Sequence, residues 1–138
     1  EGYFSDITRT FVVAAEPTQP QLEAHGAVRA AARTARTLAA PGVAASEVDV
    51  AARDALTEAG YGKFFIHRTG HGLGLEVHEE PYINQNSAVV LESGMTFTVE
   101  PGVYIPTLGG IRIEDDIVIT QDGSRSLTSL PRDLLVVG

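Results

Sequence analysis

The sequence predicts an α+β domain that is built from two helices followed by an antiparallel sheet. Two Ala-rich segments with apolar residues at helical spacing occupy the first half of the chain, and short β-branched runs separated by turn signals occupy the second half. With 138 residues, of which 43% are hydrophobic, the chain can bury a single core. We therefore expect one domain, or most of one.

The first predicted element is a strand from Tyr3 to Val13, because β-branched and aromatic residues dominate this stretch. No turn signal precedes the strand, and on this ground we expect that the chain is cut off at its N-terminus. Thr18 can cap the long Ala-rich helix that follows, which Pro41 and Gly42 end.

A second helix is predicted from about Glu47 to Ala59. Ser46 and Asp49 have the spacing of a capping box, and Gly60 follows the helix as a C-terminal cap would. Further along, Asp122 and Gly123 lie between two β-branched runs and predict a hairpin turn. The remaining strands are predicted at residues 88–91, 96–100, 111–120 and 134–137.

The composition excludes several classes of partner and site. A net charge of -8 leaves no electrostatic basis for non-specific binding of nucleic acid, so we expect no nucleic-acid partner. The chain has no cysteine, which excludes thiolate metal sites, disulfides and a cysteine nucleophile. Apolar stretches fall far short of the roughly 20 residues that span a bilayer. We therefore expect no membrane partner and a cytoplasmic location.

Three carboxylates lie within predicted strands, where a charged side chain is costly unless it is paired or binds a cation. Asp6 lies in the first strand, Glu100 ends the run MTFTV, and Glu114 interrupts the run IRIEDDIVI. Strand alternation could instead point each of them to solvent. For any single carboxylate the two interpretations are of equal weight, but three of them together favour a metal site.

A glycine-rich segment carries three of the four histidines, His67, His71 and His78. Glycines on both sides of His71 let the backbone pass close to a ligand while the imidazole points inward. One imidazole with several carboxylates suits Mn, Co, Zn or Fe ions. Bridging carboxylates favour two ions, which can lower the pKa of a shared water to about 7. Hydrolysis is then the natural reaction class.

Four motifs resemble the signature set of the pita-bread metallopeptidases, of the prolidase and aminopeptidase P type: SDITRTF, HRTGHGLGLEVHEEPYI, VEPGVY and RIEDD. They occur in order along essentially the whole chain. The resemblance implies a partial pita-bread (creatinase/aminopeptidase) fold, with helices packed on a curved antiparallel sheet. Residues 1–138 would then be the C-terminal part of a single catalytic domain that lacks its N-terminal domain and first strands.

The resemblance also implies the metal ligands. Asp6 and Glu114 should bridge two divalent ions, while His71 and Glu100 should hold one of them. The family has a further aspartate upstream of Asp6, which this chain does not contain. We therefore expect two ions in the full-length enzyme, manganese before cobalt or zinc, and one or none in this fragment, whose own activity should suffer accordingly.

The substrate contacts carried over from the family are His67, His78 and Arg112. His78 should also act in catalysis by steadying the tetrahedral intermediate, and Glu100 should carry the proton from the nucleophilic water to the leaving nitrogen. The expected substrate is a proline-containing peptide, and the full-length protein is expected to be a homodimer.

The implied function is metal-dependent hydrolysis of the peptide bond preceding proline, as an Xaa-Pro dipeptidase or an Xaa-Pro aminopeptidase. One alternative is a non-catalytic pita-bread module that binds peptides or proteins. Another is a creatinase-like hydrolase that works without metal. Intact His71, Glu100 and Glu114 argue against both alternatives.

Overall fold

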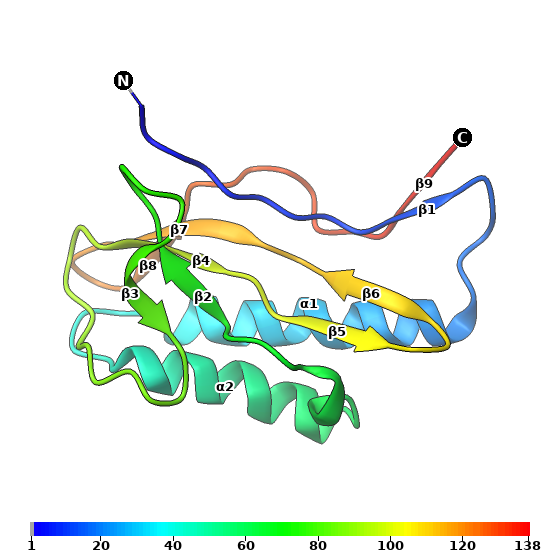
Figure 1. Ribbon diagram of the computed structural model, residues 1–138, viewed down its shortest axis with the longest axis horizontal. Helices are drawn as coiled ribbons and strands as arrows, with labels where there is room; N and C mark the ends of the chain where they lie inside the picture. The colour runs from blue at the N-terminus through cyan, green and yellow to red at the C-terminus, as the bar shows by residue number, and fades with distance from the viewer. Residues whose placement is uncertain (1) are drawn as a thin grey trace.

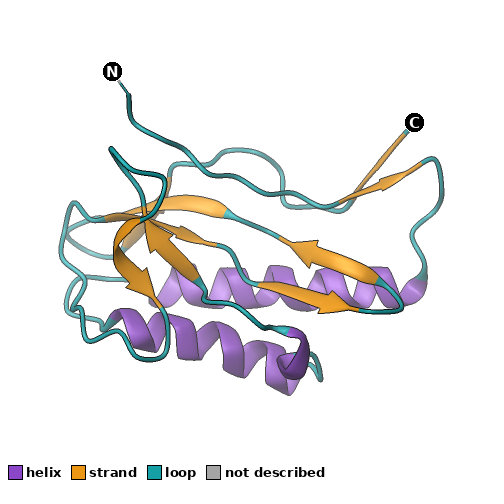
Figure 2. Cartoon of the chain, in the orientation of Figure 1, coloured by secondary structure: helices purple, strands orange, loops and turns teal. Residues whose placement is uncertain are grey.

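Two helices cover one face of the strands in the computed structural model, which describes residues 2–138 (Figure 1). The helices α1 (Gln19–Leu38) and α2 (Ala45–Glu58) pack against each other and bury their alanine-rich faces beneath the sheet. The strands form the second layer, and loops join the two (Figure 2). The predicted α+β class is confirmed.

The helix starts show how local sequence sets the element boundaries. Thr18 is the N-cap of α1 as predicted, and the side-chain oxygen of Gln21 accepts from the Thr18 amide at 2.8 Å. The predicted capping box at Ser46 is wrong, because Ala44 is the N-cap of α2. There the Glu47 carboxylate accepts from the Ala44 amide at 2.9 Å.

The main sheet is antiparallel and has the strand order β3-β2-β4-β7-β8. A separate hairpin joins β5 and β6, and β1 pairs with β9 in parallel. The core lies between the helices and these strands and contains Leu56, Phe97 and Ile117. The strand bounds are β1 Phe11–Val13, β2 Gly70–Gly72, β3 Glu79–Ile83, β4 Thr96–Val99, β5 Gly102–Ile105, β6 Gly109–Arg112, β7 Asp115–Ile119, β8 Ser124–Ser126 and β9 Leu135–Val137, and a short 3₁₀ turn covers Gly62–Phe64.

Several predicted strands differ from the observed ones. Only Phe11–Val13 of the first predicted strand is in a ladder. The run 88–91 makes a single bridge, from Val90 to Ala44. The run 111–120 divides into β6 and β7, since the chain changes partner from β5 to β4 in between. The hairpin turn at Asp122–Gly123 is confirmed by the pairing of β7 with β8.

The N-terminal segment, residues 2–10, crosses the sheet on the side away from the helices, next to the C-terminal residues (Figure 1). Its backbone makes single hydrogen bonds and forms no ladder. The Phe4 amide donates to the Gly74 carbonyl at 2.9 Å, and the Glu114 amide donates to the Thr8 carbonyl at 3.0 Å. This segment therefore passes over the end of β2 and the start of β7.

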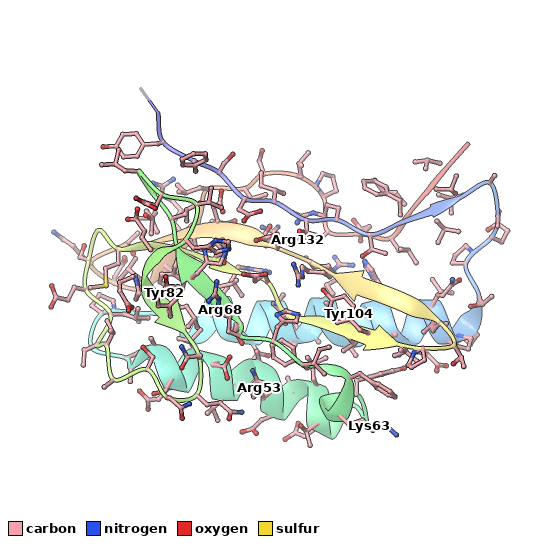
Figure 3. All side chains as sticks on the ribbon, in the orientation of Figure 1. Arg53, Lys63, Arg68, Tyr82, Tyr104 and Arg132 are labelled. Atoms are coloured by element: carbon pink, nitrogen blue, oxygen red, sulfur yellow. The ribbon has the colours of Figure 1, made fainter. Side chains whose placement is uncertain are left out.

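A buried carboxylate ties four parts of the chain together. Asp115 is fully buried and accepts from Arg9 at 2.7 Å, Arg36 at 2.8 Å and Arg132 at 2.6 Å. These arginines come from the N-terminal segment, α1 and the loop before β9, and Figure 3 labels Arg132. Asp115 directly follows Glu114, so this cluster supports one of the predicted ligands from behind.

Within residues 2–138, no helix has both the length and the apolar character that crossing a membrane requires.

Candidate metal centre

A cleft of 470 Å³ opens where the N-terminal segment passes over β2 and the ends of β4 and β6. Every site residue predicted from the sequence lines it. The lining side chains are Asp6, Thr8, His67, Arg68, His71, His78, Glu100, Arg112 and Glu114. Tyr104 of β5 borders the same region, and Figure 3 labels Arg68 and Tyr104.

Strand β2 places His71 at the floor of the cleft, between β3 and β4. A Cβ on Gly70 would collide with the Thr98 carbonyl oxygen, and one on Gly72 would collide with the Glu80 carbonyl oxygen. Both flanking glycines are therefore required for the close packing of β2 against the neighbouring backbone. The imidazole they flank is only 2% exposed.

The orientation of His71 is set by its own backbone. Its Nδ1 lies 3.0 Å from the Gly72 carbonyl oxygen, which can only accept, so Nδ1 carries the proton. The Nε2 lone pair then faces Glu100 Oε1 at 3.3 Å and Asp6 Oδ2 at 3.7 Å. Burial lowers the pKa of His71, which keeps the ring neutral and Nε2 free to bind.

Two buried glutamates complete the centre. Burial raises the pKa of Glu100, against the opposing effects of Arg112 and of the Thr98 hydroxyl. Burial also raises the pKa of Glu114 to about 7, although the Thr8 hydroxyl donates to its Oε2. Carboxylates whose ionised form is disfavoured in this way are stabilised when a cation arrives.

The residues present fit a divalent metal. His71, Glu100 and Glu114 each offer a ligand atom within 4.8 Å of the others, and so do Asp6, His71 and His78. These two groups share His71. An unprotonated imidazole nitrogen surrounded by carboxylate oxygens is a donor set for first-row divalent ions, and without a cation its acceptor atoms would repel one another.

The three predicted substrate contacts take different positions around this centre. His78 is exposed, and its ring lies 4.2 Å from that of His71 between centroids. His67 stands farther away, with Nε2 at 3.4 Å from Arg112 Nη2. Arg112 reaches Glu100 through Nη1 at 3.4 Å, and its Nε is buried with no partner among the described residues.

Sequence reasoning missed the two hydroxyls that hold the ligands. Thr8 donates to Glu114, and Thr98 donates to Glu100 Oε1 at 3.1 Å while accepting from the His71 amide at 3.1 Å. Each threonine stands two residues before or after a predicted ligand, Asp6 or Glu100, in extended chain. Period-two alternation places such residues on one face, and this signal could have found them.

Comparison with known proteins adds an independent finding. The pattern of metallopeptidase family M24 matches residues 1–121. The Xaa-Pro dipeptidase of Pyrococcus furiosus is 50% identical over 133 residues, which are 96% of this chain and 38% of that protein.

Solved structures show the same likeness. The dipeptidase of Pyrococcus horikoshii OT3 is 50% identical with a TM-score of 0.95, over 98% of this chain and 38% of that one. The X-Pro aminopeptidase of Thermotoga maritima MSB8 is 43% identical with a TM-score of 0.95, over 99% of this chain and 38% of that one. The chain thus spans little more than a third of the length of each relative.

Proposed function

The chain belongs to metallopeptidase family M24, and from this membership we propose that it carries the metal-binding part of a hydrolase that cleaves the peptide bond preceding proline. The names of its relatives, an Xaa-Pro dipeptidase and an X-Pro aminopeptidase, support this substrate class. Under this proposal residues 1–138 are the C-terminal part of a longer pita-bread catalytic domain.

The convergence of acceptor atoms in the cleft carries the proposal. His71 Nε2 faces Glu100 at 3.3 Å and Asp6 at 3.7 Å. Glu114 offers a ligand atom within 4.8 Å of those of His71 and Glu100. Packing of a folded core does not by itself favour this arrangement, because it brings nitrogen and oxygen atoms of like partial charge together where little water reaches them. Divalent ions held by Asp6, His71, Glu100 and Glu114 would polarise the scissile carbonyl and lower the pKa of water.

Glu100 is the proposed general base and acid. Its carboxylate lies in the cleft beside the other proposed ligands, where it would accept a proton from the attacking water and return it to the leaving nitrogen. Arg112 at 3.4 Å holds this carboxylate in place. The exposed ring of His78 is free to donate to the oxygen of the scissile carbonyl.

His67 and Arg112 are the proposed contacts for the rest of the substrate. Their side chains form a pair at 3.4 Å on one wall of the cleft, where the Arg112 side chain is 31% exposed. A guanidinium that the substrate can reach suits the carboxylate of a short peptide. This pairing would favour small substrates with a free C-terminus close to the scissile bond.

The decisive assay compares two substrates with the full-length protein that carries this chain, supplied with Mn²⁺. Hydrolysis of an Xaa-Pro dipeptide but not of an Xaa-Pro-Yaa tripeptide identifies a dipeptidase, and the reverse identifies an aminopeptidase. Glu100→Gln should lower kcat by about 10²- to 10⁴-fold, whereas Glu58→Gln, an exposed control at the end of α2, should not. Failure to cleave either substrate would refute the proposal.

We further propose that two ions, manganese first, bind in the full-length protein and that the 138-residue chain holds at most one tightly. The support is that the four proposed ligands fall into two groups that share His71, whereas the family has a further aspartate. Mass spectrometry of metals after dialysis measures the content. Two tightly held ions per 138-residue chain would contradict this proposal.

A homodimer and a cytoplasmic location of the full-length protein also belong to this proposal. Sedimentation equilibrium of that protein tests the first, since a monomer at micromolar concentration would contradict it. Cell fractionation tests the second.

A further inference from the structure

A pair of charged residues on α2 holds the loop that carries His67. The Asp49 carboxylate is fully buried and accepts from Arg53 Nε at 2.6 Å and Nη2 at 3.4 Å. Arg53 in turn donates to the Phe65 carbonyl at 3.1 Å and to the His67 carbonyl at 2.6 Å. Its guanidinium also lies 4.3 Å from the centre of the Phe65 ring.

Asp49 also accepts a hydrogen bond from the peptide group that joins Arg68 to Thr69, close to His67. Its Oδ1 accepts from the Thr69 amide at 2.9 Å, and this amide belongs to the same peptide plane as the Arg68 carbonyl. The N–H and C=O of a trans peptide point in opposite directions. Once Asp49 holds the amide, the Arg68 carbonyl is therefore fixed on the other side of that plane.

The Arg68 carbonyl oxygen lies 2.7 Å from His67 Nδ1. A carbonyl only accepts, so His67 must carry its proton on Nδ1 and leave Nε2 as an acceptor. Nε2 is the atom that faces Arg112 in the cleft, at 3.4 Å. A chain of contacts thus runs from Asp49 through a single peptide plane to the protonation pattern of a cleft histidine.

We propose that Asp49 and Arg53 are positioning residues, which fix His67 as its Nδ1–H tautomer and aim its Nε2 at Arg112 and the substrate. The role in substrate binding rests on the proposed function, whereas the effect on the tautomer does not. The spacing of Ser46 and Asp49 predicted a different role for Asp49, in a capping box at the start of α2. Its complete burial and its bonds to a loop 20 residues away assign it to the cleft instead.

A purely structural role is the competing explanation, because Asp49 and Arg53 also tie α2 to the sheet. Stability alone cannot separate the two explanations. The tautomer of His67 can, because anchoring of the helix has no direct effect on it.

Long-range ¹H–¹⁵N spectra of the metal-free 138-residue chain report the tautomer of each histidine. We expect His67 to be the Nδ1–H form in the wild type. In Asp49→Asn and Arg53→Lys its two ring nitrogens should shift toward a mixture of tautomers. His71, whose Nδ1 bonds Gly72 and not the Asp49 loop, should keep its shifts and serves as a control in the same spectrum. Asp54→Asn, on the exposed side of α2, is the matched control variant.

The kinetic arm uses the full-length protein with Mn²⁺. Each variant should raise KM for the Xaa-Pro substrate by between about 10- and 100-fold while kcat changes little, as expected for a misplaced binding group. Arg53→Lys retains a cation for Asp49, so it can be measured even where Asp49→Asn is too unstable.

The outcomes separate the two proposals. An Nε2–H form in the wild type, or variants that lower stability but leave both the tautomer and KM unchanged, would overturn the positioning role. A tautomer shift in a protein without any Xaa-Pro hydrolysis supports the positioning of His67 and refutes the proposed function.

Discussion

At the centre of the cleft, the unprotonated imidazole nitrogen of His71 faces carboxylate oxygens. His71 Nε2 meets Glu100 Oε1 at 3.3 Å, and burial disfavours the charge on Glu100 and Glu114. Burying these groups raises the free energy of the folded state. Binding of a cation offsets this cost, because the cation interacts favourably with the buried imidazole and carboxylates. Affinity for a metal is therefore coupled to the protonation of these residues.

This coupling predicts how the affinity for Mn²⁺ depends on pH. Burial raises the pKa of Glu114 to about 7, so below that pH a cation must displace a proton. The lowered pKa of His71 means that its ring is already neutral there. We expect the affinity to rise up to about pH 7 and then level off. Calorimetry in two buffers of different ionisation enthalpy should detect proton release in the wild type and less of it in Glu114→Gln.

The raised pKa of Glu114 also predicts how the stability of the metal-free chain depends on pH. The pKa of Glu114 is 4.5 in the unfolded chain and about 7 in the folded chain, so between these pH values the folded state binds more protons. The free energy of unfolding must then fall as the pH rises. Relative to Glu114→Gln, the wild type should lose on the order of 3 kcal/mol between pH 5 and pH 8 in urea unfolding. A difference that does not change with pH would contradict this, and Glu58→Gln should behave like the wild type.

At the scale of elements, strand β2 does the most to build the centre. Its three residues are Gly70, His71 and Gly72, and they lie between two other strands. Glycine and histidine have little preference for strands. The strand exists because its neighbours approach so closely that no larger residue would fit beside His71.

Gly70→Ala tests this close packing. The added Cβ would meet the backbone oxygen of Thr98, which cannot move without displacing β4. We expect a loss of about 1–3 kcal/mol in the free energy of unfolding and weaker Mn²⁺ binding by calorimetry. Gly26→Ala on α1 is the control, because its Cβ meets nothing within 4 Å and alanine favours helix. Equal stability of the two variants would argue against the tight fit.

The elements also show what could be predicted from the sequence. Both helices were found to within about two residues, because their apolar spacing and end signals are local. Strand β2 was missed, since a tertiary fit and not propensity creates it. The candidate ligands Asp6, Glu100 and Glu114 were singled out because a carboxylate in an apolar pattern is conspicuous, and the structure brings them to one cleft with His71. Asp49 was misread because one of its partners, the Thr69 amide, lies outside its own helix and 20 residues away.

At the scale of the whole molecule, the predicted pita-bread architecture is confirmed by its likeness to dipeptidase and aminopeptidase structures, with TM-scores of 0.95. Two features join the distant parts of the chain. One is the parallel pairing of β1 with β9, and the other is the cluster of three arginines around Asp115. Both attach the N-terminal part of the chain to distant residues.

Asp115→Asn should therefore destabilise the molecule as a whole. Three guanidinium groups would lose the charge that balances them in a buried place, and breaking a buried pair costs about 3–5 kcal/mol. Asp133→Asn is the control: its ion pair with Arg29 is more than half exposed, and losing it should cost about 0–1 kcal/mol. Urea unfolding of both variants measures the difference. A loss in Asp115→Asn no larger than in the control would show that the cluster contributes little.

The position of Asp6 and Thr8 over the cleft also has a consequence for the order of folding. Asp6 bonds Asp116 across 110 residues of sequence, and Thr8 bonds Glu114 across 106. Contacts of such long range close slowly, whereas helices and the β7–β8 hairpin form from neighbouring residues. On refolding, helical circular dichroism should recover first, and the ability to capture a cation should return only in the last kinetic phase.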